Sequence, residues 1–179
     1  MKIIDSPFDK CIIIKPSLFE DDRGYFFESF NEQRFNNLTG ADVHFVQDNQ
    51  SSSYYGVLRG LHFQKDKYAQ AKLVRVLKGE VFDVAVDLRP ESVTYGKWHG
   101  VILSAKNKLQ FFIPRGFAHG FVVLSDTAEF CYKCDNYYNK EAESGVHYAD
   151  PELAIDWHVS KENLIVSDKD KILPFLAQL

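Results

Sequence analysis

The sequence predicts a mostly β protein that folds as a sandwich or jelly roll. Its 179 residues include 15 Phe and 9 Tyr, and these aromatic residues stand in short runs separated by turn residues. Runs of this kind are typical of strands, and eight or more of them at short spacing favour a sandwich or jelly roll. A doubly wound α/β sheet would need a helical pattern between successive strands, and only two helical patterns are present.

The clearest predicted strand covers residues 80–88. Apolar residues alternate there with a second set that contains Asp83 and Asp87. Because successive side chains of a strand point to opposite faces, we expect one apolar face and one face that carries both carboxylates. The other predicted strands are residues 11–15, 24–30, 72–77, 98–103, 110–114, 120–124 and 129–134.

Two segments are predicted to be helical. The first, Asn31–Leu38, ends before Gly40, which suits a helix stopped by a left-handed glycine. The second begins at Ser167, has Asp170 three residues later as a capping-box partner, and is interrupted by Pro174.

Composition indicates one ordinary domain over residues 1–179. The length suffices for a sizeable core, and no repeat, low-complexity tract or linker divides the chain. Lys and Arg number 21 against 25 Asp and Glu, so a net charge of −4 without a basic block argues against a nucleic-acid partner. No apolar run approaches the roughly 18 residues of a membrane span, and residues 1–10 lack the apolar stretch of a signal peptide. We expect a cytoplasmic protein with no membrane partner.

The three cysteines do not form a convincing metal or redox motif. Cys131 and Cys134 make a C-x-x-C, and Cys11 stands alone. Residues three apart in a strand point to opposite faces, so both sulfurs are not expected to meet one zinc ion or one disulfide partner. Two packed thiols are the preferred interpretation.

Arg59 and His62 lie in a strand-like run, residues 57–64, and are the first candidates for chemistry. A cation and an imidazole together suit anion binding and proton transfer, although a surface strand with a hydrogen-bonded histidine is an equal alternative. Their odd spacing would place them on opposite faces of a regular strand. Gly60 is where a bulge or bend would bring them together.

A second motif, P-x-G-x-x-H, runs from Pro114 to His119. It resembles the second motif of cupins, which are small β-barrel or jelly-roll domains. In metal-binding cupins the first motif supplies H-x-H and a following Glu, whereas this chain has His62, then Gln64, and no Glu before Gly79. Two imidazoles and an amide are a weak ligand set for Zn²⁺ or Fe²⁺, so we expect a cupin-type barrel without a metal.

Strings along nearly the whole chain resemble the dTDP-4-dehydrorhamnose 3,5-epimerase family, enzymes of dTDP-L-rhamnose synthesis. The strings are DRGYF at 22–26 with Glu28 and Phe30, FVQDN at 45–49, GVLRGLHFQ at 56–64, KLVRV at 72–76, DVAVD at 83–87, IPRGFAHGF at 113–121, YKC at 132–134, IDW at 155–157 and SDKD at 167–170. The chain departs from the family pattern at residues 145–151, where a Trp is usual, and at Ala71, where Gly is common. Neither departure replaces a proposed catalytic residue.

The resemblance implies inversion of C3 and C5 of a 4-keto-6-deoxy sugar nucleotide through an enolate. This chemistry needs a base, an acid on the other face of the sugar and positive charge near O4, and it needs no metal or redox cofactor. By resemblance, His62 is the base, Tyr132 is the acid and Lys72 stabilises the enolate with help from Arg59. The family implies that Asp170 orients His62, but the sequence leaves Asp83 open for this role, and a helix-cap role open for Asp170.

The resemblance also implies a set of substrate-binding residues and a second copy of the chain. The set is Arg23, Glu28, Gln47, Asn49, Arg59, Lys72, His119, Glu143 and Lys169. Gln47 and Asn49 alternate on one strand face, where they suit a thymine edge, and Tyr138 is a candidate for stacking on the base or sugar. The family is homodimeric, with Arg23 reaching the partner's site.

Three alternatives remain open from the sequence. One is a relative that inverts a single carbon or moves the ketone of another deoxysugar nucleotide. The second is a cupin that binds a nucleotide sugar without turning it over, and the third is a metal-dependent cupin.

Overall fold

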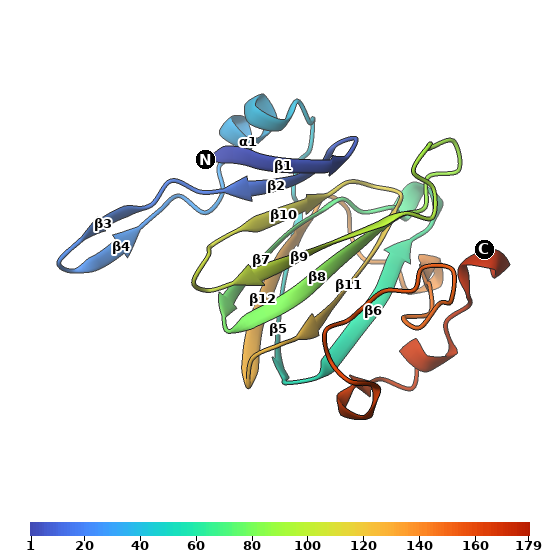
Figure 1. Ribbon diagram of the computed structural model, residues 1–179. Helices are drawn as coiled ribbons and strands as arrows, with labels where there is room; N and C mark the ends of the chain where they lie inside the picture. Colours follow the sequence, from blue (N-terminus) through green and yellow to red (C-terminus); the bar gives the residue numbers. More distant parts are fainter.

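The computed structural model describes residues 1–179 as two sheets that face each other, with a projecting hairpin (Figure 1). The first sheet has the order β1 (Lys2–Phe8), β2 (Cys11–Lys15), β10 (Gln110–Ile113), β7 (Lys72–Lys78), β12 (Thr127–Cys134) and β5 (Gln47–Tyr54). The second has the order β13 (Glu143–Gly145), β6 (Val57–Gln64), β11 (Phe117–Val123), β8 (Glu80–Asp87) and β9 (Trp98–Ser104), and β14 (Ile165–Val166) pairs with β6. The hairpin is β3 (Phe19–Asp21) and β4 (Gly24–Phe26). All pairs are antiparallel except β14 with β6.

The predicted strands are confirmed within a few residues, with one exception. The strand expected at residues 24–30 ends at Phe26, where the hairpin ends. The structure adds four strands that the sequence did not predict, β1, β3, β13 and β14, and β1 lies at the edge of the first sheet. The predicted run at residues 57–64 is β6, and β11 begins at Phe117, so His119 is its third residue.

The main core lies between the two sheets, and this corrects the expectation for β8. Asp83 and Asp87 are fully buried, because the face that carries them also carries Val81 and Ala85, which pack in that core. The opposite face of β8 is buried too, under the C-terminal segment. No face of β8 is therefore a solvated polar face.

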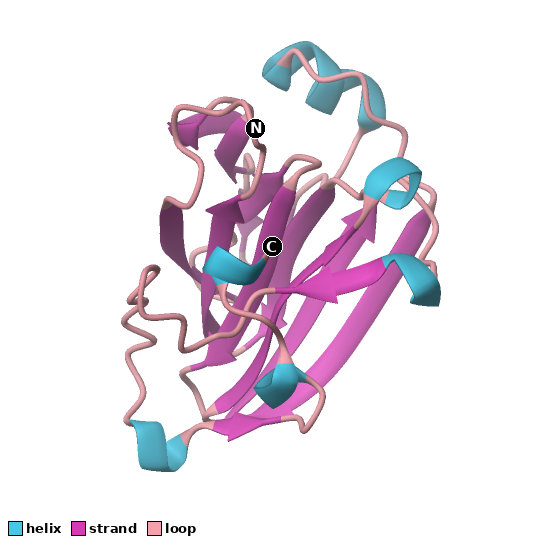
Figure 2. Cartoon of the chain, turned by 90° about the vertical axis from the view of Figure 1, so that its right-hand side faces the viewer, coloured by secondary structure: helices cyan, strands magenta, loops and turns pink.

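The outer faces of the two sheets are covered by different segments. Figure 2 shows the C-terminal segment lying across the second sheet, and Leu153, Trp157 and Leu176 from this segment pack on it. The helix α1 (Glu32–Thr39) packs Phe35 against the first sheet. None of the helices has the length and apolar character needed to cross a bilayer.

The first helix prediction is confirmed in its details. The side chain of Asn31 caps α1 by accepting a hydrogen bond from the Arg34 N–H at 3.0 Å. Gly40 ends the helix with φ of 66°, in the left-handed region.

The second helix prediction is wrong. The segment after Ser167 forms only the 3₁₀ turn η4 (Asp170–Ile172) before Pro174. The Ser167 Oγ accepts the N–H of Asp170 at 3.1 Å, as in a capping box, but the carboxylate of Asp170 turns to β6 instead of back to Ser167. The remaining 3₁₀ turns are η1 (Asp66–Tyr68), η2 (Lys140–Ala142), η3 (Lys161–Asn163) and η5 (Leu176–Gln178).

Candidate active site

A cavity of about 610 Å³ between the sheets contains most of the predicted site residues. It adjoins a smaller cavity of about 230 Å³, since both are lined by Asn49, His62, Lys72 and Tyr132. The larger cavity also contacts Arg59, His119, Lys169 and Asp170, and the smaller one Gln47, Tyr138 and Glu143. Residues from distant parts of the sequence therefore form one site.

A bulge in β6 places Arg59 and His62 on the same side. Opposite β11, His119 pairs with His62 and Phe121 with Arg59, so three steps of β6 match two steps of β11. The extra residue reverses the alternation, as the sequence analysis anticipated at Gly60. Gly60 has φ of +121°, and a Cβ there would lie 2.6 Å from the Cα of Gly120. Only glycine fits this position.

His62 is held by Asp170, which decides between the two carboxylates that the sequence left open. The Nε2 of His62 lies 2.7 Å from the Asp170 Oδ1, and the Oδ2 accepts the N–H of Gly60 at 3.2 Å. Burial alone would raise the pKa of Asp170, but its hydrogen bonds with His62 and Gly60 hold that pKa below its ordinary value. Asp83 instead faces His119, at 2.9 Å.

This pairing leaves one nitrogen of His62 free to act. An ionised carboxylate only accepts hydrogen bonds, so the proton of the neutral ring belongs on Nε2. The Nδ1 of His62 makes no hydrogen bond within the chain, and the ring is on the cavity wall. Nδ1 is thus an unprotonated nitrogen available to a ligand.

Tyr132 projects into the same cavity from β12, in the opposite sheet. Phe130 and Tyr132 line the larger cavity, whereas Cys131 lines neither of the two cavities. It lies with Arg75 at a third cavity of about 260 Å³, which Tyr132 also borders. The Tyr132 hydroxyl has no hydrogen bond within the chain, and burial raises its pKa, so the phenol is protonated at neutral pH.

The cysteines are free thiols, as the packed-thiol interpretation predicts. Burial raises the pKa of Cys134 to about 11, which makes its thiol a poor nucleophile at neutral pH.

Lys72 brings a positive charge to the cavity beside Tyr132. Its Nζ lies 6.0 Å from the centre of the Tyr132 ring and forms no ion pair within 4.0 Å. Burial lowers the pKa of Lys72, and the charges of Asp83 and Glu143 oppose that shift. An ammonium group without a partner on the wall of a cavity is suited to an anionic oxygen of a ligand.

The smaller cavity ends in a chain of polar contacts. Gln47 donates to the Asn49 Oδ1 at 3.1 Å and accepts the N–H of Tyr138 at 3.0 Å. The Tyr138 hydroxyl donates to Glu143 at 2.8 Å, and Lys169 lies 2.5 Å from the other oxygen of Glu143. Burial acts to raise the pKa of Glu143, but these two hydrogen bonds lower it.

Ser53 is a site residue that the sequence analysis missed. Its buried hydroxyl accepts a hydrogen bond from the Arg59 Nε at 3.1 Å, which leaves the two terminal nitrogens of Arg59 free. The signal was present in the sequence, since the alternation of Gln47 and Asn49 continues through Ser51 to Ser53 on one face of β5.

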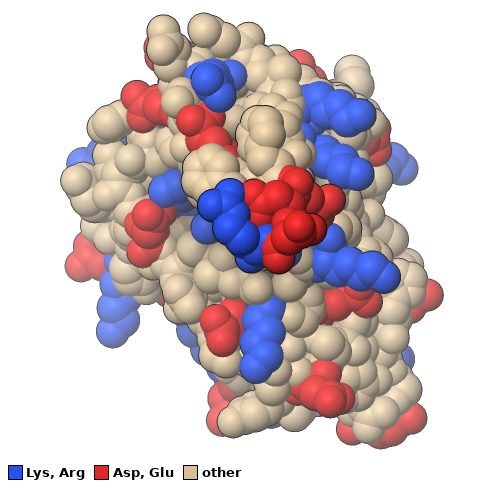
Figure 3. Space-filling view, turned by 90° about the vertical axis from the view of Figure 1, so that its left-hand side faces the viewer, with Lys and Arg blue, Asp and Glu red and all other residues tan.

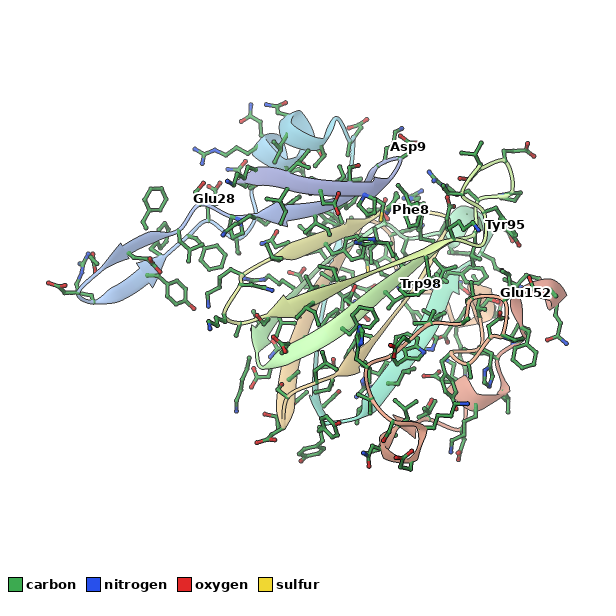
Figure 4. All side chains as sticks on the ribbon, in the orientation of Figure 1. Phe8, Asp9, Glu28, Tyr95, Trp98 and Glu152 are labelled. Carbon is green, nitrogen blue, oxygen red and sulfur yellow. The ribbon has the colours of Figure 1, made fainter.

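Arg23 and Glu28 lie outside both cavities. Arg23 is at the turn of the β3–β4 hairpin, paired with Asp21, and Figure 3 shows acidic and basic side chains next to each other on the side where the hairpin projects. Glu28 lies at the base of the hairpin and contacts Arg34 at 3.2 Å. Figure 4 shows Glu28 on the opposite side of the molecule from the C-terminal segment, which carries Asp170.

Nowhere in the chain do three His, Cys, Asp or Glu side chains gather as a ligand set for a metal ion. The cavity instead combines a paired imidazole, a free phenol and a free ammonium group. This arrangement can remove a proton on one side of a ligand, return one on the other side and stabilise a negative oxygen between them.

Comparison with known proteins covers the whole chain. Residues 5–178 match the family model described as dTDP-4-dehydrorhamnose 3,5-epimerase. The chain is 54% identical to the dTDP-4-dehydrorhamnose 3,5-epimerase of Escherichia coli K12, over 100% of this chain and 96% of that relative.

Solved structures agree with the sequence comparison. A crystal structure of dTDP-4-dehydrorhamnose 3,5-epimerase from Elizabethkingia anophelis has a TM-score of 0.96 and 59% identity, over 99% of this chain and 97% of that chain. A dTDP-6-deoxy-D-glucose-3,5-epimerase from Legionella pneumophila, in complex with dTDP-4-keto-L-rhamnose, has a TM-score of 0.95 and 52% identity, over 99% and 94%.

Proposed function

Since the chain belongs to the dTDP-4-dehydrorhamnose 3,5-epimerase family, it is an isomerase, and we propose that His62 and Tyr132 transfer the protons. The substrate is dTDP-4-dehydro-6-deoxy-D-glucose, and inversion at C3 and C5 gives dTDP-4-dehydro-L-rhamnose. The observation that carries the mechanism is the His62–Asp170 pair, which faces Tyr132 and Lys72 across one cavity.

The first step is removal of a proton from a carbon beside the ketone. The C–H bond breaks, the proton goes to the Nδ1 of His62, and the electron pair forms a C=C bond to C4 while O4 becomes an enolate oxygen. Asp170 accepts the Nε2–H of His62 and stabilises the imidazolium that results. Because the acidic C–H bonds lie next to the ketone, these steps require no metal and no redox cofactor.

The second step returns a proton to the other face of the ring. Lys72 stabilises the negative charge on O4, and the protonated Tyr132 hydroxyl donates to the carbon. The phenolate then regains a proton from solvent, and the His62 imidazolium releases its proton to solvent, so both groups return to their starting states. His62 and Tyr132 lie on strands of opposite sheets, so donation from Tyr132 inverts the centre that His62 deprotonated.

The nucleotide occupies the remaining polar walls. Arg59, oriented by Ser53, has two free nitrogens that match the oxygens of a diphosphate. Asn49 and Gln47 face the smaller cavity, next to Tyr138, where an aromatic ring and amide groups suit a pyrimidine base.

We further propose that the functional unit is a homodimer. The β3–β4 hairpin exposes Phe19 and Phe26, which are 67% and 71% exposed, and it carries Arg23 away from the cavity of its own chain. A second copy would cover these aromatic rings and receive Arg23 at its site. Three free thiols support a reducing compartment, the cytoplasm.

Product stereochemistry tests this function against its alternatives. The dTDP-4-keto-6-deoxyglucose substrate is incubated with the protein, and the ring protons are assigned by NMR. Two inverted centres are expected. One inverted centre or a moved ketone identifies a related isomerase, and binding of the nucleotide without conversion identifies a non-catalytic cupin.

A further inference from the structure

A second histidine–carboxylate pair, His119 and Asp83, lies beside the first, and nothing above gives Asp83 a task. His119 on β11 is the direct cross-strand partner of His62 on β6. Its Nε2 lies 2.9 and 3.1 Å from the two carboxylate oxygens of Asp83, which is fully buried on β8. The ring of His119 stacks against Phe130, with ring centres 6.0 Å apart. The pair is therefore built into the barrel interior.

The geometry defines the tautomer of His119. Both oxygens of Asp83 approach the same nitrogen, and a single N–H on Nε2 donates to both of them. If Asp83 carried the proton instead, one oxygen would donate to the lone pair of Nε2 and the other oxygen would face that lone pair with no proton between them. The Nδ1 of His119 has no hydrogen-bond partner in the chain. Every side-chain nitrogen or oxygen atom that is fully buried does have such a partner, so Nδ1 is not one of these buried atoms. Nδ1 is thus accessible, and the cavity that His119 lines is the large one at the active site.

Asp83 also brings a negative charge to the side of the cavity that His119 lines, and Lys72 lines the same cavity. The interior faces of β7 and β8 pack in the same core, and Lys72 has no ion pair of its own. The ionisable groups around Lys72 come from several strands: His62 of β6, Asp83 of β8, His119 of β11, Tyr132 and Cys134 of β12, and Glu143 of β13. Burial lowers the pKa of Lys72 and raises that of Asp83, and the mutual attraction of the two charges opposes both shifts.

We propose that Asp83 is a positioning residue for the epimerisation, which fixes the tautomer of His119 and keeps the Lys72 ammonium charged. This inference rests on the proposed role of Lys72. With Nε2–H committed to Asp83, the Nδ1 of His119 is an acceptor for a hydroxyl of the bound sugar. The charge of Asp83 offsets the cost of burying the ammonium that O4 requires in the enolate.

The pH profile of Asp83→Asn tests the proposal. Asparagine keeps the shape but removes the charge, so the ammonium of Lys72 is lost at lower pH. The alkaline limb of kcat is expected to move about one pH unit lower than in the wild type. An alkaline limb that stays at the wild-type pH overturns the proposal. The stereochemistry of the wild-type product tests the epimerisation separately, so failure of one can be told from failure of the other.

Asp87→Asn is the matched control, because Asp87 is equally buried on the same face of β8 and pairs with Arg89 outside the site. Its alkaline limb is expected to coincide with that of the wild type. A shift as large as that of Asp83→Asn would show that loss of any buried carboxylate of β8 moves the limb, which overturns the specific role of Asp83.

Nitrogen-15 NMR of the unaltered enzyme tests the tautomer even where Asp83→Asn does not fold. The ring signals of His119 are assigned by their absence from His119→Gln. A proton on Nε2, none on Nδ1, and no titration between pH 7 and 9 are expected. A proton on Nδ1, or titration in this range, overturns the proposal whether or not the enzyme is active.

Discussion

Lys72 is the residue whose environment most requires a ligand. It is a partly buried cation without an ion pair, and burial lowers its pKa although the charges of Asp83 and Glu143 oppose that shift. Unpaired groups of this kind persist where they bind or react, and the free Tyr132 hydroxyl beside Lys72 belongs to the same class.

Replacement of Lys72 by methionine is expected to lower kcat by about 10²- to 10³-fold, the usual loss for one group that stabilises a developing oxyanion. Folding should be kept or improved, since a buried charge is removed. Lys78→Met is the control, because Lys78 is exposed at the end of the same strand. Steady-state kinetics of both variants check this, and a Lys72→Met enzyme as active as Lys78→Met would contradict the role of the ammonium.

Most of the residues that the sequence proposed for the site line the two cavities, but the sequence did not predict how they pair. Asp83 and Asp170 were both open as partners of His62, since neither periodicity nor spacing reports which loop folds back on a strand. The structure separates them because β14 pairs with β6 and carries Asp170 to the bulge at Gly60.

At the scale of the elements, the bulge in β6 couples the fold to the site. One extra residue turns Arg59 and His62 to the same side, and Gly60 is the position where the backbone of β11 comes too close for any side chain. The sequence could locate this element because a glycine interrupted a charged, strand-like run. It could not predict the C-terminal turn, since the contacts of Asp170 with β6 replace its helix-capping role.

Gly60→Ala is expected to destabilise the protein by about 2–3 kcal/mol and to abolish most activity, because its Cβ would collide with Gly120 and its φ would be strained. Gly40→Ala is the control, with a left-handed φ of +66° but open space around it, and should cost about 1 kcal/mol. Urea unfolding and activity assays check both. Equal stability losses with full activity in Gly60→Ala would contradict the close approach at the bulge.

Asp87 anchors the loop after β8 through Arg89 at 2.7 Å and the hydroxyls of Ser92 and Thr94 at 2.6 Å each. Burial acts to raise its pKa, but these hydrogen bonds hold that pKa below its ordinary value. A carboxyl group with a depressed folded-state pKa stabilises above its unfolded pKa of about 3.9, and this contribution is lost as the pH falls toward the folded value.

Asp87→Asn should therefore lower the free energy of unfolding by about 2–3 kcal/mol at pH 7, less than a wholly buried pair because Arg89 is 26% exposed. A loss of this size leaves a typical domain folded. The difference from the wild type should shrink as the pH falls below about 4. Urea unfolding at several pH values checks this, and a difference independent of pH would show that the charge of Asp87 is not what stabilises the loop.

At the scale of the whole molecule, the all-β, cupin-type barrel predicted from the sequence is confirmed. Alternating apolar runs and turn residues predict strands because burial of one face imposes that pattern. Such patterns do not show which covering segment packs on which sheet. For that reason the sequence predicted one polar face for β8, whereas Asp83 and Asp87 are both buried in the interior.

The projecting hairpin predicts a dimer in solution. Sedimentation equilibrium should give about twice the chain mass of 20.6 kDa. Mixed dimers of Arg23→Ala and His62→Ala should regain activity that neither variant has alone, because one composite site then holds both intact residues. A monomeric active enzyme, or no recovery on mixing, would contradict a shared site.

Hydrogen exchange during turnover in heavy water tests the opposed pair of His62 and Tyr132 most directly. The wild type should introduce deuterium at C3 and C5 with inversion. His62→Ala should introduce none, and Tyr132→Phe should exchange protons on the face of His62 without inverting the carbon at the wild-type rate. Undiminished exchange in His62→Ala, or full inversion by Tyr132→Phe, would contradict the mechanism.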